Sequence, residues 1–171
     1  NILFVLVLSV MMIPGQVTMI PLYLIFTSLG WIDTYLPLIV PHFFGSAFYV
    51  FMVRQFFLTL PPELMEAATI DGCGQLRTFW SIALPLVKPA VVTVAVFTFV
   101  AVWNEFFTPL LYLNSPAKYT IPLGLTAFRG EPVVHYDYLM PASTVAILPV
   151  LAVFLFFQRY FVQGLLAGSV K

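Results

Sequence analysis

Charged side chains are scarce in this chain, and the scarcity excludes several classes of protein. The 171 residues include seven Lys or Arg and seven Asp or Glu, 8% of the total, whereas soluble domains carry roughly 25%. Hydrophobic residues make up 61% of the chain, and the mean hydropathy is +1.02. The formal net charge is zero, so no basic surface predicts nucleic-acid binding. The composition indicates an integral membrane protein.

Cysteine and catalytic motifs are also nearly absent. Cys73 is the single cysteine of the sequence, which excludes an internal disulfide and a cysteine metal cluster. The sequence contains no G-x-x-x-x-G-K-[ST], no G-x-S-x-G and no H-E-x-x-H. His42 and His135 lack acidic or cysteine companions at ligand spacing, so we read both as ordinary histidines. We therefore expect no catalytic residue, no metal site and no cofactor bound by this chain.

The gaps between charges predict the membrane topology. No Asp, Glu, Lys or Arg occurs in residues 1–32, 34–53, 89–104 or 138–158. Because a transmembrane helix needs about 20 mostly apolar residues, we predict an all-α integral membrane fold. Its four spans are expected at about 2–29, 35–57, 89–113 and 139–161.

Two of these spans carry features of note. The first is interrupted by Pro14, Gly15 and Pro21, which lipid-embedded helices tolerate where neighbours satisfy the freed backbone groups. The third is expected to continue as a helix past Asn104. Because no repeat or linker divides the spans, we expect a single membrane domain over 1–171.

Basic residues set the expected orientation. Five of the seven lie in the loop at about 58–88, at its flanks, or at the C-terminal end: Arg54, Arg77, Lys88, Arg159 and Lys171. An even number of crossings puts both regions on one side, and the positive-inside rule makes that side cytoplasmic.

The start of the 58–88 loop has the design of a polar helix. Pro61 and Pro62 suit the first helical turn, where a missing N–H is tolerated. Glu63 and Glu66 follow, where negative charge meets the positive end of the helix dipole. Gly72 predicts the end of this helix.

A second short helix is predicted over 75–83. Leu84-Pro85 is expected to close it, because the residue before a proline is pushed out of helical geometry. The loop is therefore expected to be a helix, a glycine corner and a helix.

The same loop carries a resemblance to a known family. Glu66-Ala67-Ala68, Asp71-Gly72 and Ile82-Ala83-Leu84-Pro85 follow one another between two apolar spans. This string resembles the "EAA" loop of membrane subunits of bacterial ABC importers. Within that family the chain is similar to carbohydrate-importer permeases, above all the second membrane subunit of the maltose-type transporter. The similar stretches extend over nearly the whole chain, at 13–17, 21–23, 103–105, 119–124 and 158–168.

The resemblance implies a fold, a location and a function. Such permeases are multi-pass proteins of the bacterial plasma (inner) membrane with six spans and cytoplasmic termini, so we expect about two spans to precede residue 1. The implied function is transport of a sugar or polyol by alternating access, without catalysis by this chain. An ABC permease for another solute class is the nearest alternative.

The resemblance also implies partners. These are a dimer of ATPase subunits that uses ATP and Mg, a second homologous permease subunit, an extracytoplasmic solute-binding protein and membrane lipid. The cytoplasmic coupling helix and its surroundings would contact the ATPase through Glu66, Ala67, Ala68, Asp71, Gly72, Arg77, Leu84 and Pro85. From residue chemistry alone, Glu66 is either a charge offered to a basic pocket or part of a solvated helix face.

Asn104, Glu105 and Thr108 are the candidate residues of the translocation path. Burying an ionisable group in a span is expensive, so Glu105 predicts a functional role. A carboxylate near the interface, or one hydrogen-bonded to a neighbouring helix, explains it equally well. Glu105 also supports a rival function, an ion-coupled secondary transporter, whose discontinuous helices contain Pro and Gly.

Overall fold

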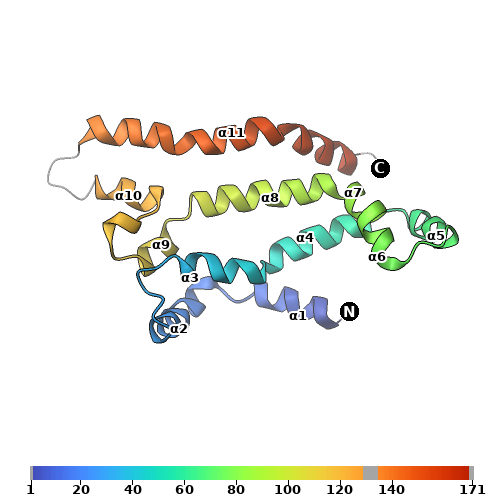
Figure 1. Ribbon diagram of the computed structural model, residues 1–171, viewed down its shortest axis with the longest axis horizontal. Helices are drawn as coiled ribbons and strands as arrows, with labels where there is room; N and C mark the ends of the chain where they lie inside the picture. The colour runs from blue at the N-terminus through green and yellow to red at the C-terminus, as the bar shows by residue number, and fades with distance from the viewer. Residues whose placement is uncertain (1, 129–134, 170–171) are drawn as a thin grey trace.

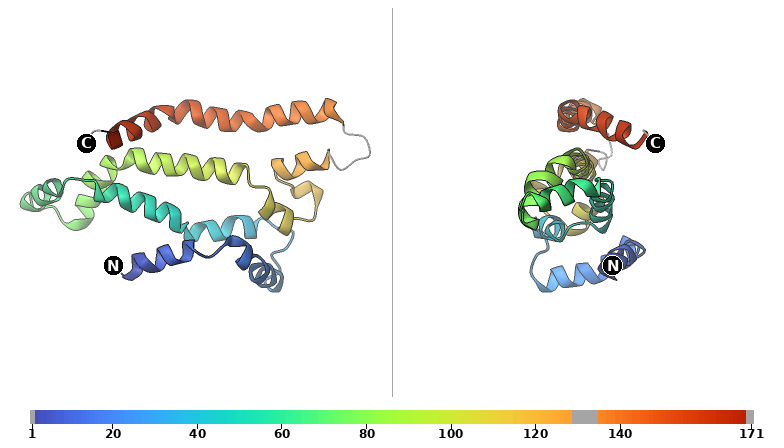
Figure 2. Two further views of the ribbon diagram at one scale, coloured as in Figure 1. Left: turned by 180° about the vertical axis from the view of Figure 1, so that it is seen from behind. Right: turned by 90° about the vertical axis from the view of Figure 1, so that its right-hand side faces the viewer.

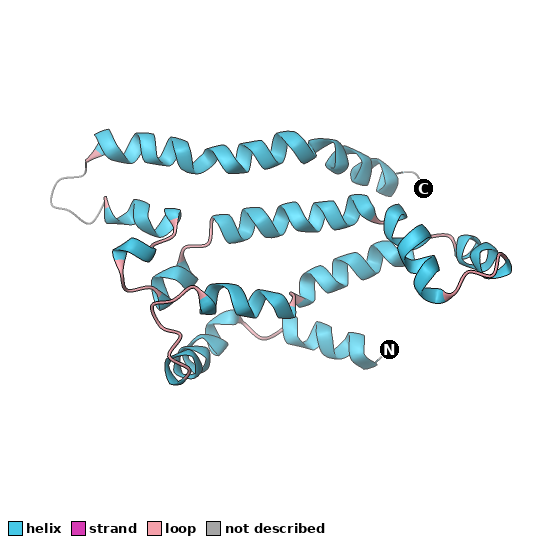
Figure 3. Cartoon of the chain, in the orientation of Figure 1, coloured by secondary structure: helices cyan, strands magenta, loops and turns pink. Residues whose placement is uncertain are grey.

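Every regular element in the described part of the chain is helical. The computed structural model describes residues 2–128 and 135–169 and is shown in Figures 1 and 3. Its elements are α1 (Ile2–Met11), α2 (Gly15–Ser28), α3 (Leu36–Ile39), the 3₁₀ helix η1 (Val40–Phe44), α4 (Ala47–Leu58), α5 (Pro62–Ile70), α6 (Gln75–Thr78), the π-helical turn η2 (Phe79–Ala83), α7 (Leu84–Leu86), α8 (Lys88–Trp103), α9 (Phe107–Tyr112), the 3₁₀ helix η3 (Pro116–Lys118), α10 (Ile121–Ala127) and α11 (Tyr136–Ser169). The all-α prediction is confirmed.

The long helices form a single row. α11 packs against α8, α8 against α4, and α4 against α1, as Figures 1 and 2 show. The start of α1 and the end of α11 lie at the end of the molecule that carries α5, here called the inner end. The opposite end, which carries α9, η3 and α10, is called the outer end. This arrangement agrees with an even number of crossings.

A row one helix thick leaves much apolar surface uncovered. Ile20, Val145, Leu155 and Phe156 are among the large exposed apolar side chains. Exposed apolar side chains of this kind suit contact with lipid or with other membrane subunits.

Small side chains allow the helices to approach each other at the inner end. Ala83, Val87 and Ala90 are buried where α7 meets α8. The inner ends of α4 and η2 are also joined, because the rings of Phe57 and Phe79 stack at a centroid distance of 5.9 Å. The loop that contains α5 is therefore attached to a packed base.

Two described stretches are long and apolar enough to cross a membrane as they stand, Leu36–Leu58 and Tyr136–Gln158. Two bent pairs also qualify if each pair is counted as one span. Phe4–Met11 and Gly15–Ser28 meet at 94°, and Gln75–Leu86 and Lys88–Trp103 meet at 69°. Two to four spans are therefore possible by length and composition, and the four predicted ranges stay a prediction.

The first predicted span, 2–29, is divided into two helices. Pro14 has an extended backbone (φ −61°, ψ 134°) and stands at the N-cap of α2. Because a proline lacks the N–H that would bond the carbonyl four residues earlier, a helix running into Pro14 loses a hydrogen bond and meets its ring. Pro21, by contrast, lies inside α2 without ending it.

The helix predicted to continue past Asn104 ends there instead. α8 stops at Trp103, and α9 begins at Phe107. Pro109 lies in the first turn of α9, and in an uninterrupted helix its ring would clash with the carbonyl of Glu105, four residues earlier.

The helix predicted to close at Leu84-Pro85 runs through it, so that prediction is wrong. α6, η2 and α7 follow one another without a gap from Gln75 to Leu86, and Leu84 has helical angles (φ −63°, ψ −43°). The Leu84 N–H bonds the Phe79 carbonyl, five residues earlier. Such a widened turn directly before Pro85 makes room for a ring that a regular α-helix would exclude. The chain bends after Val87 instead, at the start of α8.

Asp33 joins two distant segments at the outer end. Its Oδ1 accepts hydrogen bonds from the backbone N–H groups of Asn114 (3.0 Å) and Ser115 (2.9 Å). Its Oδ2 accepts from the Ser115 hydroxyl (2.6 Å) and the Lys118 ammonium (2.9 Å), residues 82 and 85 positions away. The Asp33 N–H also donates to the Tyr112 carbonyl at 2.8 Å. We call this arrangement the Asp33 clamp.

The clamp keeps Asp33 ionised. The hydrogen bond from Lys118, followed by those from Ser115 and Asn114, holds the pKa of the Asp33 carboxyl well below its ordinary value of 3.8. A carboxyl whose pKa is depressed by folding stabilises the folded state above its unfolded-state pKa, and this contribution is lost as the pH falls below that value. The clamp is therefore fully formed at neutral pH.

Aromatic rings pack beneath the clamp. Phe26 stacks on Trp31 at 5.4 Å and meets Tyr112 edge-on at 5.2 Å. Tyr23 stacks on Tyr112 at 6.2 Å. Phe26 and Tyr112 are buried, so α2, α9 and the turn between α2 and α3 form one packed unit at the outer end.

The clamp predicts a specific loss of stability. Asp33→Asn removes the charge that Lys118 meets, so we expect a lower thermal unfolding midpoint for detergent-solubilised protein at neutral pH. Asp137→Asn is the control, because the Asp137 carboxylate is 66% exposed and lies 3.7 Å from His135. Equal midpoints for the two variants would show that the clamp contributes nothing to stability.

Candidate functional site

The helix α5 is bounded by features that its sequence supplies. Pro61 is extended (φ −58°, ψ 129°) and Pro62 takes the first helical position, with Glu63 in the first turn. At the other end the Gly72 N–H bonds the Thr69 carbonyl (3.0 Å) and the Cys73 N–H bonds the Ala68 carbonyl (2.9 Å). This pair of bonds is a Schellman motif.

The motif depends on glycine at position 72. Gly72 has a φ of +74°, in the left-handed region that other residues adopt only with strain. Gly74 follows with an ordinary extended backbone (φ −69°, ψ 158°) and starts α6. The predicted helix, glycine corner and helix are therefore present.

α5 projects beyond the ends of α4 and α8 at the inner end (Figure 1). Glu66 and Ala67 are exposed, whereas Ala68 is buried. No described residue pairs with the Glu66 carboxylate. Ile70, Leu76 and Trp80 are 86%, 78% and 64% exposed on the same loop. An exposed helix of this kind, with apolar neighbours and an unpaired charge, is suited to contact with another protein.

The predicted coupling residues do not all lie on this projecting part. Asp71 and Gly72 form its corner, and Arg77 is exposed on α6. Leu84 and Pro85 lie at the base of the loop, in α7, where the chain turns into α8. The eight residues therefore lie along one segment of the chain, which consists of α5, the Gly72 corner and the helix from α6 to α7.

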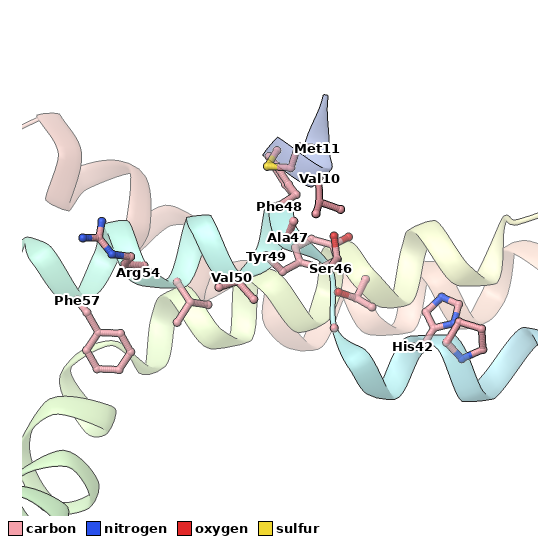
Figure 4. Close-up of a pocket in the computed structure, with 14 residues that line it drawn as sticks. Val10, Met11, His42, Ser46, Ala47, Phe48, Tyr49, Val50, Arg54 and Phe57 are labelled. Atoms are coloured by element: carbon pink, nitrogen blue, oxygen red, sulfur yellow. The ribbon is translucent and has the colours of Figure 1, made fainter. Parts of the chain in front are cut away.

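Three cavities adjoin η1 and α8 in the described part of the chain. One of them, about 1130 Å³, extends along η1 and α4, from His42 to Arg54 and Phe57 (Figure 4). At its inner end the Arg54 guanidinium lies 4.0 Å from the centre of the Phe4 ring, an attractive cation–π contact.

A second cavity of about 460 Å³ contains two of the three predicted path residues. Glu105 and Thr108 line it, together with polar side chains from other elements: Tyr35, His42, Ser46, Tyr49, Thr98 and Thr120. Asn104 does not line it; its side-chain amide donates to the Val100 carbonyl at 2.8 Å. The third cavity, of about 860 Å³, adjoins on the α10 side.

Beside this cavity, the Glu105 side chain bonds the start of α9. One carboxylate oxygen accepts hydrogen bonds from the N–H groups of Phe107 (2.9 Å) and Thr108 (3.1 Å). These are the first N–H groups of α9, which have no partner within the helix. Glu105 therefore caps the helix that Pro109 separates from α8.

Sequence reasoning missed several residues that the fold brings together. His42 was read as an ordinary histidine, and it lines all three cavities. The pairing of Asp33 with Lys118, 85 residues later, was not predicted. Periodicity within one helix gives no signal for residues that meet from separate elements. Within the described part of the chain, no group of three His, Cys, Asp or Glu side chains is placed to hold a metal ion.

A projecting inner helix, a row of apolar helices and a cavity that contains Glu105 are features expected of a membrane transport component. A family model described as "Binding-protein-dependent transport system inner membrane component" matches residues 1–167. The chain belongs to this family. It is accordingly an inner-membrane component, and the resemblance seen in its sequence is confirmed.

Individual relatives agree. The chain is 43% identical over 171 residues to the arabinooligosaccharides transport system permease protein AraQ of Bacillus subtilis, covering 100% of this chain and 60% of the relative. It is 42% identical over 185 residues to Protein LplC of the same organism, covering 100% and 62%. It is 37% identical over 168 residues to the sn-glycerol-3-phosphate transport system permease protein UgpE of Yersinia enterocolitica, covering 96% and 59%. The chain thus spans about three fifths of the length of the curated relatives it matches.

A solved structure shares the fold. The crystal structure of a bacterial ABC transporter involved in the import of the acidic polysaccharide alginate contains a chain that matches with a TM-score of 0.75. The match covers 94% of this chain and 61% of that chain at 23% identity. The fold is therefore that of an ABC importer permease.

The two glycines of the loop give a matched test of the corner. A Cβ at either position would meet no atom within 4 Å, so only the backbone angle separates them. We expect Gly72→Ala to destabilise the corner by about 1–2 kcal/mol, the usual strain of a left-handed residue, and Gly74→Ala to be nearly neutral. Hydrogen exchange of the Cys73 amide in the two variants measures this difference, and equal exchange would contradict it.

Two variants of Glu105 separate the effect of its helix-capping hydrogen bonds from the effect of its negative charge. Glu105→Gln keeps an oxygen acceptor for the Phe107 and Thr108 N–H groups, so thermal stability should be nearly unchanged. Glu105→Ala removes the acceptor and should destabilise the protein by about 1 kcal/mol, as lost helix caps do. If both variants unfold at the same temperature, the cap does not contribute to stability.

Proposed function

We propose that this chain is the transmembrane subunit of an ABC importer, that it forms the path for a sugar or polyol, and that it has no catalytic role of its own. The family and the shared fold support the importer class. The names of AraQ and UgpE, which refer to arabinooligosaccharides and sn-glycerol-3-phosphate, support a sugar or polyol as the solute. The observation that carries the proposal is the α5 helix, held clear of the bundle by the Gly72 corner with an unpaired Glu66.

ATP-driven movement would enter the chain through α5. A dimer of partner ATPase subunits, which binds ATP and Mg, would hold this helix with Glu66 in a basic pocket. Ala67 and Gly72 are exposed and have little or no side chain, which favours a close approach of the two backbones, and the buried Ala68 packs the helix against its own loop. The partner would perform the hydrolysis, and α5 would receive the resulting displacement.

The displacement would pass along a continuous helix. α6, η2 and α7 connect the corner directly to the 69° bend before α8, so Leu84 and Pro85 lie within the connecting segment. Because α8 carries Thr98 and ends at Trp103, a rotation of α8 would alter the cavity that Glu105 and Thr108 line. This coupling of a cytoplasmic movement to a cavity between helices is the physical content of alternating access.

The remaining partners follow from surfaces that this chain leaves uncovered. A second permease subunit would cover part of the apolar row, and lipid the rest. An extracytoplasmic solute-binding protein would deliver the solute to the outer end, near α9, η3 and α10.

Co-purification of the full-length protein tests the proposed contact with the ATPase. Glu66→Lys reverses the charge offered to the partner, so we expect a large loss, about tenfold or more, in the ATPase recovered with the tagged protein. Asp137→Lys is the control, because it makes the same reversal at the outer end and should leave recovery unchanged.

Two other outcomes would overturn parts of the proposal. Recovery of the ATPase that is unchanged by Glu66→Lys would remove the contact at α5. Transport that proceeds without any ATPase, and that Glu105→Gln abolishes, would favour an ion-coupled carrier instead.

A further inference from the structure

Two of the cavities share one wall. The 860 Å³ cavity and the 460 Å³ cavity lie on either side of side chains from α3, η1, α8 and the start of α10. The residues that line both are Leu38, Ile39, His42, Thr98, Val102 and Thr120. We call these six residues the shared wall.

Thr120 has an unusual place in this wall. It is the N-cap residue of α10, yet its side chain makes no capping hydrogen bond. The second helical position, which a capping threonine often bonds, is Pro122 and has no N–H. The Thr120 hydroxyl oxygen is buried and has no hydrogen-bond partner among the described residues. Buried hydroxyls are normally bonded, so this one is suited to a group from outside the chain.

Thr120 lines both cavities. No hydrogen bond among the described residues holds its hydroxyl, and rotation about the Cα–Cβ bond moves a threonine hydroxyl among staggered positions. Thr98, by contrast, donates its hydroxyl hydrogen to the Val94 carbonyl at 2.8 Å. Of the two threonines in the shared wall, only Thr120 has a hydroxyl group that is free to donate a hydrogen bond to a solute.

A fixed aromatic surface lies beside the wall. The Trp103 indole N–H donates to the Ala146 carbonyl of α11 at 3.0 Å, which holds its ring in place. Phe99 stacks on Trp103 at a centroid distance of 5.6 Å, and both line the 860 Å³ cavity. Aromatic faces of this kind pack against the apolar face of a ligand ring.

The two cavities contain little charge. Among the residues that the structure describes, no Lys, Arg, Asp or Glu lines the larger one, and Glu105 is the single charged residue that lines the smaller one. A phosphate or carboxylate on a solute would find no cation there and would face the charge of Glu105. A neutral molecule with several hydroxyl groups would find hydrogen-bond partners without this repulsion.

We propose that the shared wall is a subsite for a neutral carbohydrate, in which Thr120 and His42 hydrogen-bond solute hydroxyl groups and Phe99 and Trp103 pack against the sugar ring. The proposal rests on the proposed importer function and narrows it to an uncharged solute. It assigns Thr120 as a specificity-determining residue and excludes anionic solutes such as sugar phosphates from this site.

The test uses the full-length protein with its co-purified partners in proteoliposomes. The neutral probes are arabinotriose, maltotriose and sorbitol, and the anionic probe is sn-glycerol-3-phosphate. We expect ATP-dependent uptake of at least one neutral probe, and no competition from the anionic probe. For that neutral probe, Thr120→Val should raise the KM by about 3- to 10-fold, the usual effect of one lost hydrogen bond, with solute-independent ATP hydrolysis unchanged. Thr120→Ser should restore the KM.

Matched variants separate binding from structure. Thr93→Val is the control for threonine, because Thr93 lies on α8, bonds the Pro89 carbonyl and lines none of the three cavities. Phe99→Leu should raise the KM, whereas Phe97→Leu on the same helix should not. Because Thr120→Val removes an unpaired hydroxyl, its thermal unfolding midpoint should stay equal or rise.

Each contrary result has a distinct meaning. Preferred uptake of sn-glycerol-3-phosphate would overturn the neutral-solute assignment. An unchanged KM in Thr120→Val would overturn the role of Thr120. A lower unfolding midpoint of Thr120→Val, or a lower yield of the second permease with this variant, would show that the shared wall serves packing and not solute binding. Absence of ATP-dependent uptake for every probe would overturn the proposed function together with the subsite.

Discussion

Hydrogen bonding of the backbone is the constraint on which this structure depends. In lipid, a carbonyl or N–H without a partner is costly, so each proline in an apolar segment requires a local solution. Three solutions occur here. Pro14 ends one helix and starts another, Pro85 is accommodated by a widened turn, and Pro109 separates α8 from α9, where Glu105 supplies the missing acceptor. These local solutions determine where the helices of the row break. They also explain why the Glu105 carboxylate lies beside the 460 Å³ cavity.

Much of this was predictable from the sequence, because it rests on local chemistry. The composition and the spacing of charges predicted helices in a membrane. Pro62 and Gly72 predicted both ends of α5, since each acts through its own backbone. That the helix continues through Pro85 was not predictable in the same way. Whether a proline ends a helix or sits behind a widened turn depends on packing, here at Ala83 and Val87, and packing is not visible in a short motif.

The candidate site shows the same division. The loop from 61 to 89 is one continuous segment, so its residues could be recognised together. The cavity residues come from several elements and were recognised only in part. Glu105 and Thr108 stood out because polar side chains are rare in spans. His42 and Thr120 are candidate binding residues only because the fold brings both to the same two cavities. The unbonded state of the Thr120 hydroxyl depends on Pro122 and on the surrounding helices, which no spacing rule reports.

The Asp33 clamp has a consequence for the biogenesis of the protein. Asp33 leaves the ribosome more than 80 residues before its partners Ser115 and Lys118, which are 82 and 85 positions away. During that interval its left-handed backbone (φ 59°) lacks the bonds that hold it in the finished fold. The turn after α2 therefore acquires its final conformation only when α8 and α9 have been synthesised and inserted. The order of synthesis therefore leaves this turn unfixed while α3, α4 and α8 are made, and lets the clamp close before α11 is complete.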